Sequence, residues 1–206
     1  MSKIILSILM VAGSALAQYK YEAADAPPSE LAADVVKALQ TKGVKIVNGS
    51  GKAVCEIWFR TAPPSGPKST EDAVSLPTVP VGALLGAIRF PSQSSDRRGQ
   101  TIKPGVYTFR YVLVPVNGDH LGVAPQRDFV ALIPASDDKD PKATPSFENV
   151  VAMSKKASGT PHPAVLSIAA GSGTEGFAKE GEHDWTLNTK MGDTPVAIIL
   201  IGKAEG

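Results

Sequence analysis

The segment TIKPGVYTFRYVLVPVNGDHLGVAPQRDFVALI, Thr101–Ile133, decides the fold that we expect of this chain. Residues Val106–Val114 alternate between two sets of side chains, and this period of two is that of a β-strand. One set is aromatic or apolar and is predicted to face the core, and Phe129–Ile133 is predicted to be the return strand. The core-facing set is Tyr107, Phe109, Tyr111 and Leu113.

The opposite face of this strand carries Arg110 between valines. A guanidinium on a face that is otherwise buried requires a partner. Asp128, or Asp119 in the adjoining loop, is the nearest candidate. We therefore expect an ion-pair network that braces the loop, formed by Arg110, Asp119, His120, Arg127 and Asp128.

The loop Val116–Gln126 is longer than the usual hairpin connection. Its Asn and Gly residues supply turn chemistry, whereas the adjacent Asp119 and His120 are not needed for turning. An Asp beside a His can orient the imidazole as a base or a metal ligand. We favour the simpler interpretation, an Asx-type turn with an exposed His. His162, between two prolines, is the distant residue that would turn this brace into a site.

The three histidines of the chain, His120, His162 and His183, all fall in predicted loops of its second half. Three His ligands with an open fourth position make a hydrolytic or redox metal site. Their spacing matches no known ligand pattern. A metal-dependent enzyme that uses a divalent ion is thus the alternative function, and otherwise we expect no cofactor.

Turn signals on either side of the central segment complete the fold prediction. Asn48–Gly51 between two apolar runs predicts a hairpin. One helix is expected from Ser29 to Lys42, and a second begins at Thr144 and Pro145 and stops at Gly159. With about eight alternating strands, these elements predict a mainly β fold, an antiparallel β-sandwich with two short helices.

Two flanking segments lack a strong pattern. Gln18–Pro28 is expected to be a loose lead-in. Gly171–Gly176 matches G-x-G-x-x-G, but Gly181 prevents the long helix that a dinucleotide site needs, so we expect a loop.

Two residues of the strand Lys52–Arg60 each have a functional and a structural interpretation. Cys55 is the only cysteine, which excludes an intramolecular disulfide. Its apolar position favours a small buried side chain over a thiol nucleophile. Trp58, between Glu56 and Arg60, is either a stacking platform for a ligand or, as we favour, an aromatic covered by a loop or helix.

The first residues, Met1–Ala17, have the features of a secretory signal peptide. Lys3 is followed by a short apolar run and by Ala15-Leu16-Ala17, which predicts cleavage between Ala17 and Gln18. The apolar run is too short to span a bilayer. We therefore predict a secreted or periplasmic protein with one domain, residues 18–206, and no membrane span.

The near-equal numbers of basic and acidic residues argue against a nucleic acid as the partner. The 206 residues include 21 basic and 20 acidic side chains, without the basic excess of a nucleic-acid-binding protein. No G-x-S-x-G, H-E-x-x-H or P-loop motif is present. The prediction is a non-enzymatic module that binds a small molecule, a glycan or a protein of the cell envelope.

Five short motifs, in this order, resemble those of an uncharacterised family of exported bacterial β-sandwich-like proteins. This resemblance extends from Leu31 to the C-terminus, and it implies a fold without an activity. The motifs are EIW (56–58), PGVYTFRY (104–111), GDHLG (118–122), RDF (127–129) and SGTPHPAV (158–165).

Overall fold

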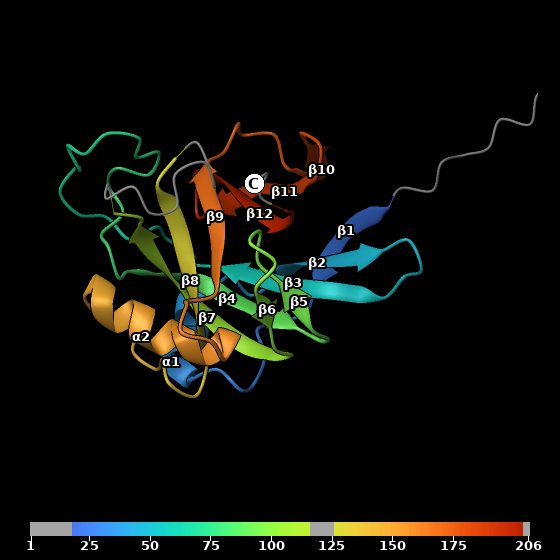
Figure 1. Ribbon diagram of the computed structural model, residues 1–206, viewed down its shortest axis with the longest axis horizontal. Helices are drawn as coiled ribbons and strands as arrows, with labels where there is room; N and C mark the ends of the chain where they lie inside the picture. Colours follow the sequence, from blue (N-terminus) through green and yellow to red (C-terminus); the bar gives the residue numbers. More distant parts are fainter. Residues whose placement is uncertain (1–17, 116–125, 204–206) are drawn as a thin grey trace, which may run out of the picture.

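Ten strands form one antiparallel sheet in the computed structural model, which describes residues 18–115 and 126–203 (Figure 1). The strands are β1 (Tyr19–Ala24), β2 (Gly43–Asn48), β3 (Ala53–Phe59), β4 (Leu84–Phe90), β7 (Gly105–Leu113), β8 (Asp128–Pro134), β9 (Val165–Ala170), β10 (Gly176–Glu180), β11 (Asp184–Met191) and β12 (Thr194–Ile201). The remaining elements are a hairpin of β5 (Ser94–Ser95) and β6 (Thr101–Ile102), and the helices α1 (Ala33–Ala38) and α2 (Phe147–Ser158).

The sheet has the order β1-β2-β3-β4-β7-β8-β9-β12-β11-β10 and curls until its two end strands approach each other. Tyr19 of β1 meets Phe177 of β10 and Trp185 of β11 there, with ring centroids 6.2 and 4.9 Å away. The predicted mainly β, antiparallel architecture with two helices is confirmed. Its ten strands are closer to a barrel than to an eight-stranded sandwich: β1 adds a strand where a loose lead-in was expected, and β10 adds another.

The inner face of the curled sheet holds the main core. The aromatic face of β7 lies there as predicted: Phe109 and Tyr111 are fully buried. Cys55 of β3 is also completely buried, which confirms its interpretation as a core residue. The predicted hairpin is confirmed too, since the Asn48 side-chain oxygen accepts hydrogen bonds from the backbone of Ser50 and Lys52.

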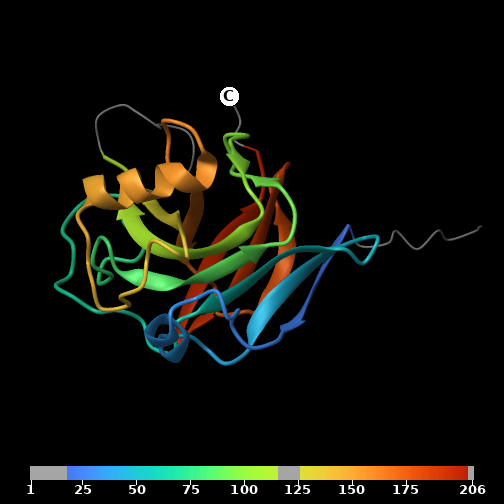
Figure 2. The same ribbon diagram turned by 90° about the horizontal axis from the view of Figure 1, so that it is seen from below.

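Helices cover two separate parts of the outer face, and they lie on different sides of the molecule (Figure 2). Helix α1 packs Val35 against Trp58 and Leu84. The Trp58 Nε1 donates a hydrogen bond to the Asp25 carbonyl, 2.8 Å away. Trp58 is thus covered as we favoured and does not form an open platform. Helix α2 covers the outer face of β7 and β8.

Both helices begin later than the sequence predicted. Helix α1 is only six residues long, since the chain at Leu39 is already extended and bridges to Arg60. Ser146, and not Thr144, caps α2 by accepting a hydrogen bond from Asn149. Gly159 ends α2 as predicted, with a φ of 69° that favours glycine. Neither described helix has the length and apolar character that crossing a membrane requires.

Candidate functional site

Arg110 is fully buried on the outer face of β7, and every one of its donors is used. Its Nε and Nη2 donate to the two carboxylate oxygens of Asp138, at 2.8 and 2.7 Å. The other N–H groups reach the carbonyls of Gly82, Ala143 and Asp140 at 2.5–2.7 Å. Since a guanidinium has five N–H donors, none is left to bind anything else. We call this arrangement of Arg110, Asp138 and the three carbonyls the Arg110 clamp.

The expected pairing of Arg110 with Asp128 is wrong. In the strand register, Asp128 lies opposite Leu113, on the inner face of the sheet, whereas Arg110 points outward. The Asp128 carboxylate instead accepts hydrogen bonds from the Tyr111 hydroxyl at 2.6 Å and from the backbone of Ser75 and Leu76. Burial, together with that hydrogen bond to Asp128, raises the pKa of the Tyr111 hydroxyl.

Arg127 and Asp128 both hold the segment that precedes β4 against the start of β8. Arg127 donates to Glu71 and to the Val114 carbonyl, each at 2.7 Å. The predicted brace therefore acts on residues 71–76. The two other members, Asp119 and His120, lie outside the described residues, so their part in a network stays a prediction.

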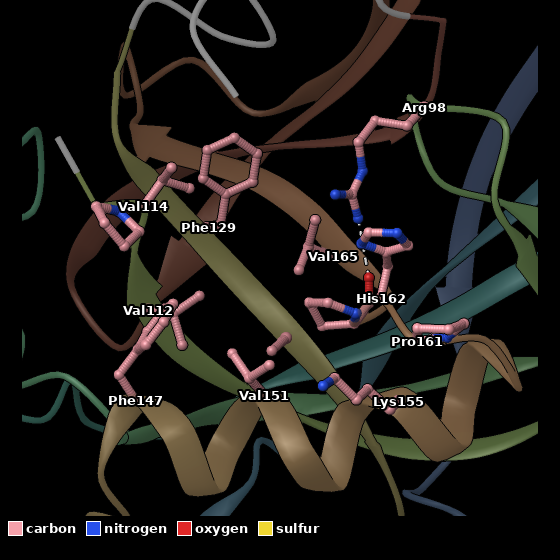
Figure 3. Close-up of a pocket in the computed structure, with 13 residues that line it drawn as sticks. Arg98, Val112, Val114, Phe129, Phe147, Val151, Lys155, Pro161, His162 and Val165 are labelled. Carbon is pink, nitrogen blue, oxygen red and sulfur yellow. Dashed lines mark hydrogen bonds between the residues drawn. The ribbon is translucent and has the colours of Figure 1, made fainter. Parts of the chain in front are cut away.

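An apolar pocket of about 280 Å³ lies between α2 and the outer face of β7, β8 and β9 (Figure 3). Helix α2 contributes one wall, the strands supply the floor, and the segment before β9 closes one end. We call this cavity the α2 pocket. Its apolar lining is Val112, Val114, Pro115, Phe129, Ala131, Phe147, Val151, Pro161, Pro163 and Val165.

The pocket is apolar because of how α2 is seated. Val150 is fully buried and packs on the sheet, in one cluster with Phe129 and Ala131. Phe147 and Val151, on the same face of the helix, are half-buried and line the pocket. Part of the apolar stripe of α2 is therefore exposed to the cavity and not fully covered by the sheet.

Three nitrogen-bearing side chains lie at the rim of the pocket: Arg98, Lys155 and His162 (Figure 3). Within the described lining there is no Asp, Glu, Ser, Thr or Cys. Neither a carboxylate nor a hydroxyl or thiol nucleophile thus accompanies His162 there. The described lining thus combines an apolar surface with basic groups at its rim.

His162 is exposed, and its backbone is tightly held. Its carbonyl accepts a hydrogen bond from the Ser158 hydroxyl at 2.6 Å, and its N–H donates to Thr160 Oγ1. The side-chain amide of Gln100 also donates to the carbonyls of His162 and Pro163. These bonds hold the Pro161–Pro163 segment, with the exposed His162 side chain at the pocket rim.

The described residues do not assemble the histidine cluster that a metal site needs. His183 lies in the turn between β10 and β11, beside Glu182, and is not part of the pocket lining. In residues 18–115 and 126–203, no group of three or more His, Cys, Asp or Glu side chains is close enough to hold a metal ion. His120 lies outside these ranges, and the metal-dependent alternative stays a prediction.

Of the rim residues, only His162 is identifiable from the sequence, and the pocket itself is not. Arg98 and Lys155 belong to no sequence pattern that indicates a site. A signal was present in α2, whose apolar positions 147, 150 and 151 form one stripe. That stripe predicts that this face of the helix packs on the sheet, but it does not predict a cavity beneath one end of the helix.

Comparisons with models of protein families, with curated proteins and with solved structures gave no match. The resemblance to exported β-sandwich-like proteins therefore rests on the five motifs alone.

Proposed function

We propose that this chain is an exported, non-enzymatic module that binds a small, largely apolar molecule in the α2 pocket. The observation that carries the proposal is the cavity of about 280 Å³ with a nearly continuous apolar lining. Small-molecule sites are concave and mostly apolar, with a few convergent polar groups. The α2 pocket has these properties, and its polar groups are confined to the rim.

A neutral fluorescent probe tests this proposal. N-phenyl-1-naphthylamine gains fluorescence in apolar surroundings, so we expect a saturable increase with one probe per chain. Val151→Trp places a large ring in the pocket from the side of α2, and we expect it to weaken binding by at least about tenfold. Val81→Trp is the matched control, because Val81 is 37% exposed and lies outside the pocket lining.

Two outcomes of this titration contradict the proposal. One is the absence of saturable binding to the wild-type chain. The other is equal binding to the two tryptophan variants, which would place the probe somewhere else on the surface.

Export is tested separately. When the full chain is expressed in a bacterium with a Sec pathway, the protein recovered from the periplasm or medium should begin at Gln18. An intact N-terminus on protein that stays in the cytoplasm contradicts this part of the proposal.

A further inference from the structure

We infer that the ligand of the α2 pocket is an amphipathic carboxylate: an apolar tail in the cavity, with its carboxylate at the rim between Arg98, Lys155 and His162. This inference rests on the proposed function and adds the chemical class of the ligand. Its basis is the charge at the rim. Among the residues described there, the ionisable side chains are all of the basic type.

Arg98 is held in place and still has donors to offer. Its Nε and Nη2 donate to the carboxylate of Asp96, and Nη2 also donates to the Pro163 carbonyl at 2.9 Å. Asp96 is only 1% exposed and also accepts hydrogen bonds from the backbone of Arg98 and Gln100. The Arg98 Nη1 takes part in none of these bonds, and it is turned toward the side of the pocket where Phe129 lies (Figure 3).

Lys155 supplies the uncompensated charge. Its side chain extends from α2 along the pocket (Figure 3) and has no hydrogen-bond or ion-pair partner among the described residues. The next residue, Lys156, pairs with Asp137 at 2.9 Å. These neighbours therefore differ in what they offer: Lys156 is already occupied by a protein carboxylate, and Lys155 is available to one from a ligand.

The charge balance favours a monoanion. Asp96 offsets the charge of Arg98, so Lys155 contributes one net positive charge and His162 contributes a second only when protonated. A single carboxylate matches one ammonium group and the two N–H donors of Arg98 Nη1, which are bonded to none of the described residues. A phosphate dianion would be left with an unbalanced charge beside the apolar lining, which is costly.

The size of the cavity limits the tail. An apolar cavity of about 150 Å³ accepts benzene, and the α2 pocket is about 280 Å³. The tail is therefore a medium-length alkyl chain, or one aromatic ring with a short substituent. The tail of a long-chain lipid would extend into solvent.

Calorimetric titration with octanoate and octan-1-ol tests the inference, because the two share a tail and differ in the headgroup. We expect octanoate to bind wild-type protein about tenfold more tightly than octan-1-ol. Lys155→Gln should reduce octanoate affinity by about fivefold and leave octan-1-ol unchanged. Lys156→Gln is the matched control, and it should change neither affinity.

Each other result has a distinct meaning. Equal affinity for octanoate and octan-1-ol, or an octanoate affinity that is insensitive to Lys155→Gln, overturns the carboxylate and leaves the pocket as a binding site. Tighter binding of octyl phosphate than of octanoate also overturns it. Absence of binding by both ligands and by the neutral probe contradicts the proposed function itself.

Discussion

The outer face of β7 is covered in two different ways along its length. At Arg110, an irregular segment lies on the strand, and its carbonyls and the Asp138 carboxylate use every donor of the guanidinium. At Val112 and Val114, a helix lies above the strand and leaves a cavity. The contrast shows that polar contacts can seal a strand face completely, whereas a rigid helix meets a curved sheet only over part of its length.

Removal of the Arg110 side chain should have the largest effect on stability. Arg110→Met leaves Asp138 buried without its counter-charge, and we expect the free energy of unfolding to fall by about 3–5 kcal/mol. Urea denaturation measures the change. The control is Lys37→Met, which breaks an exposed ion pair with Asp34 on α1 and should leave stability unaltered. A loss at Arg110 no greater than at Lys37 would show that the Arg110 clamp does not hold the fold.

Two neighbouring valines of α2 allow the packed part of the helix to be compared with the part that lines the pocket. Val150→Ala removes fully buried methyl groups and should reduce the free energy of unfolding by about 2 kcal/mol. Val151 faces the cavity, so Val151→Ala should reduce the free energy of unfolding by less than about 0.5 kcal/mol. The gain in helix propensity is the same in both. Equal losses in urea denaturation would mean that Val151 is packed and that the pocket is closed in solution.

The reactivity of a cysteine thiol should distinguish the closed core from the open pocket, and this test alters the protein least. Burial raises the pKa of Cys55 to about 12, so its thiol should resist dithionitrobenzoate in the native protein at pH 8. In Cys55→Ser with Val151→Cys, the new thiol lines the pocket and should react within minutes. Rapid reaction of native Cys55 would contradict a closed core.

The same pKa shift predicts how stability depends on pH. A thiol in the unfolded chain has a pKa near 9.0, while that of folded Cys55 is about 12. The unfolded chain therefore loses this proton first, and the free energy of unfolding should decrease as pH rises from about 9 toward 12. Cys55→Ser should remove that part of the slope in urea denaturation. An unchanged slope would show that Cys55 already ionises in the folded protein.

The sequence was sufficient for those features that depend on local periodicity. Alternation in Val106–Val114 predicted the buried aromatic face, and it also indicated that Arg110 needs a partner. The partner itself was not predictable, because Asp138 lies in an irregular segment where neither register nor turn chemistry indicates which carboxylate turns inward. Asp128 is near in sequence, and only the pairing of β7 with β8 reveals that it faces the opposite side of the sheet.

The candidate site was predictable only in part, for a similar reason. His162 between two prolines was identifiable from residue types alone. The α2 pocket depends on the angle at which a helix meets a sheet, and no single stretch of sequence contains that angle. Arg98 and Lys155 come from separate elements, and they become neighbours of His162 only through the packing of α2 and the β5–β6 hairpin.

The approach of β1 to β10 has a consequence for the motions of the protein. Aromatic contacts connect the two strands, but in the described sheet each pairs with only one neighbour. The sheet is therefore closed at this junction by side-chain contacts and not by backbone pairing. The backbone amide protons on the unpaired edges of β1 and β10 should exchange with solvent before those of β7 and β8. Because β1 pairs only with β2 in the described sheet, it can detach without disturbing the pairing of the other strands.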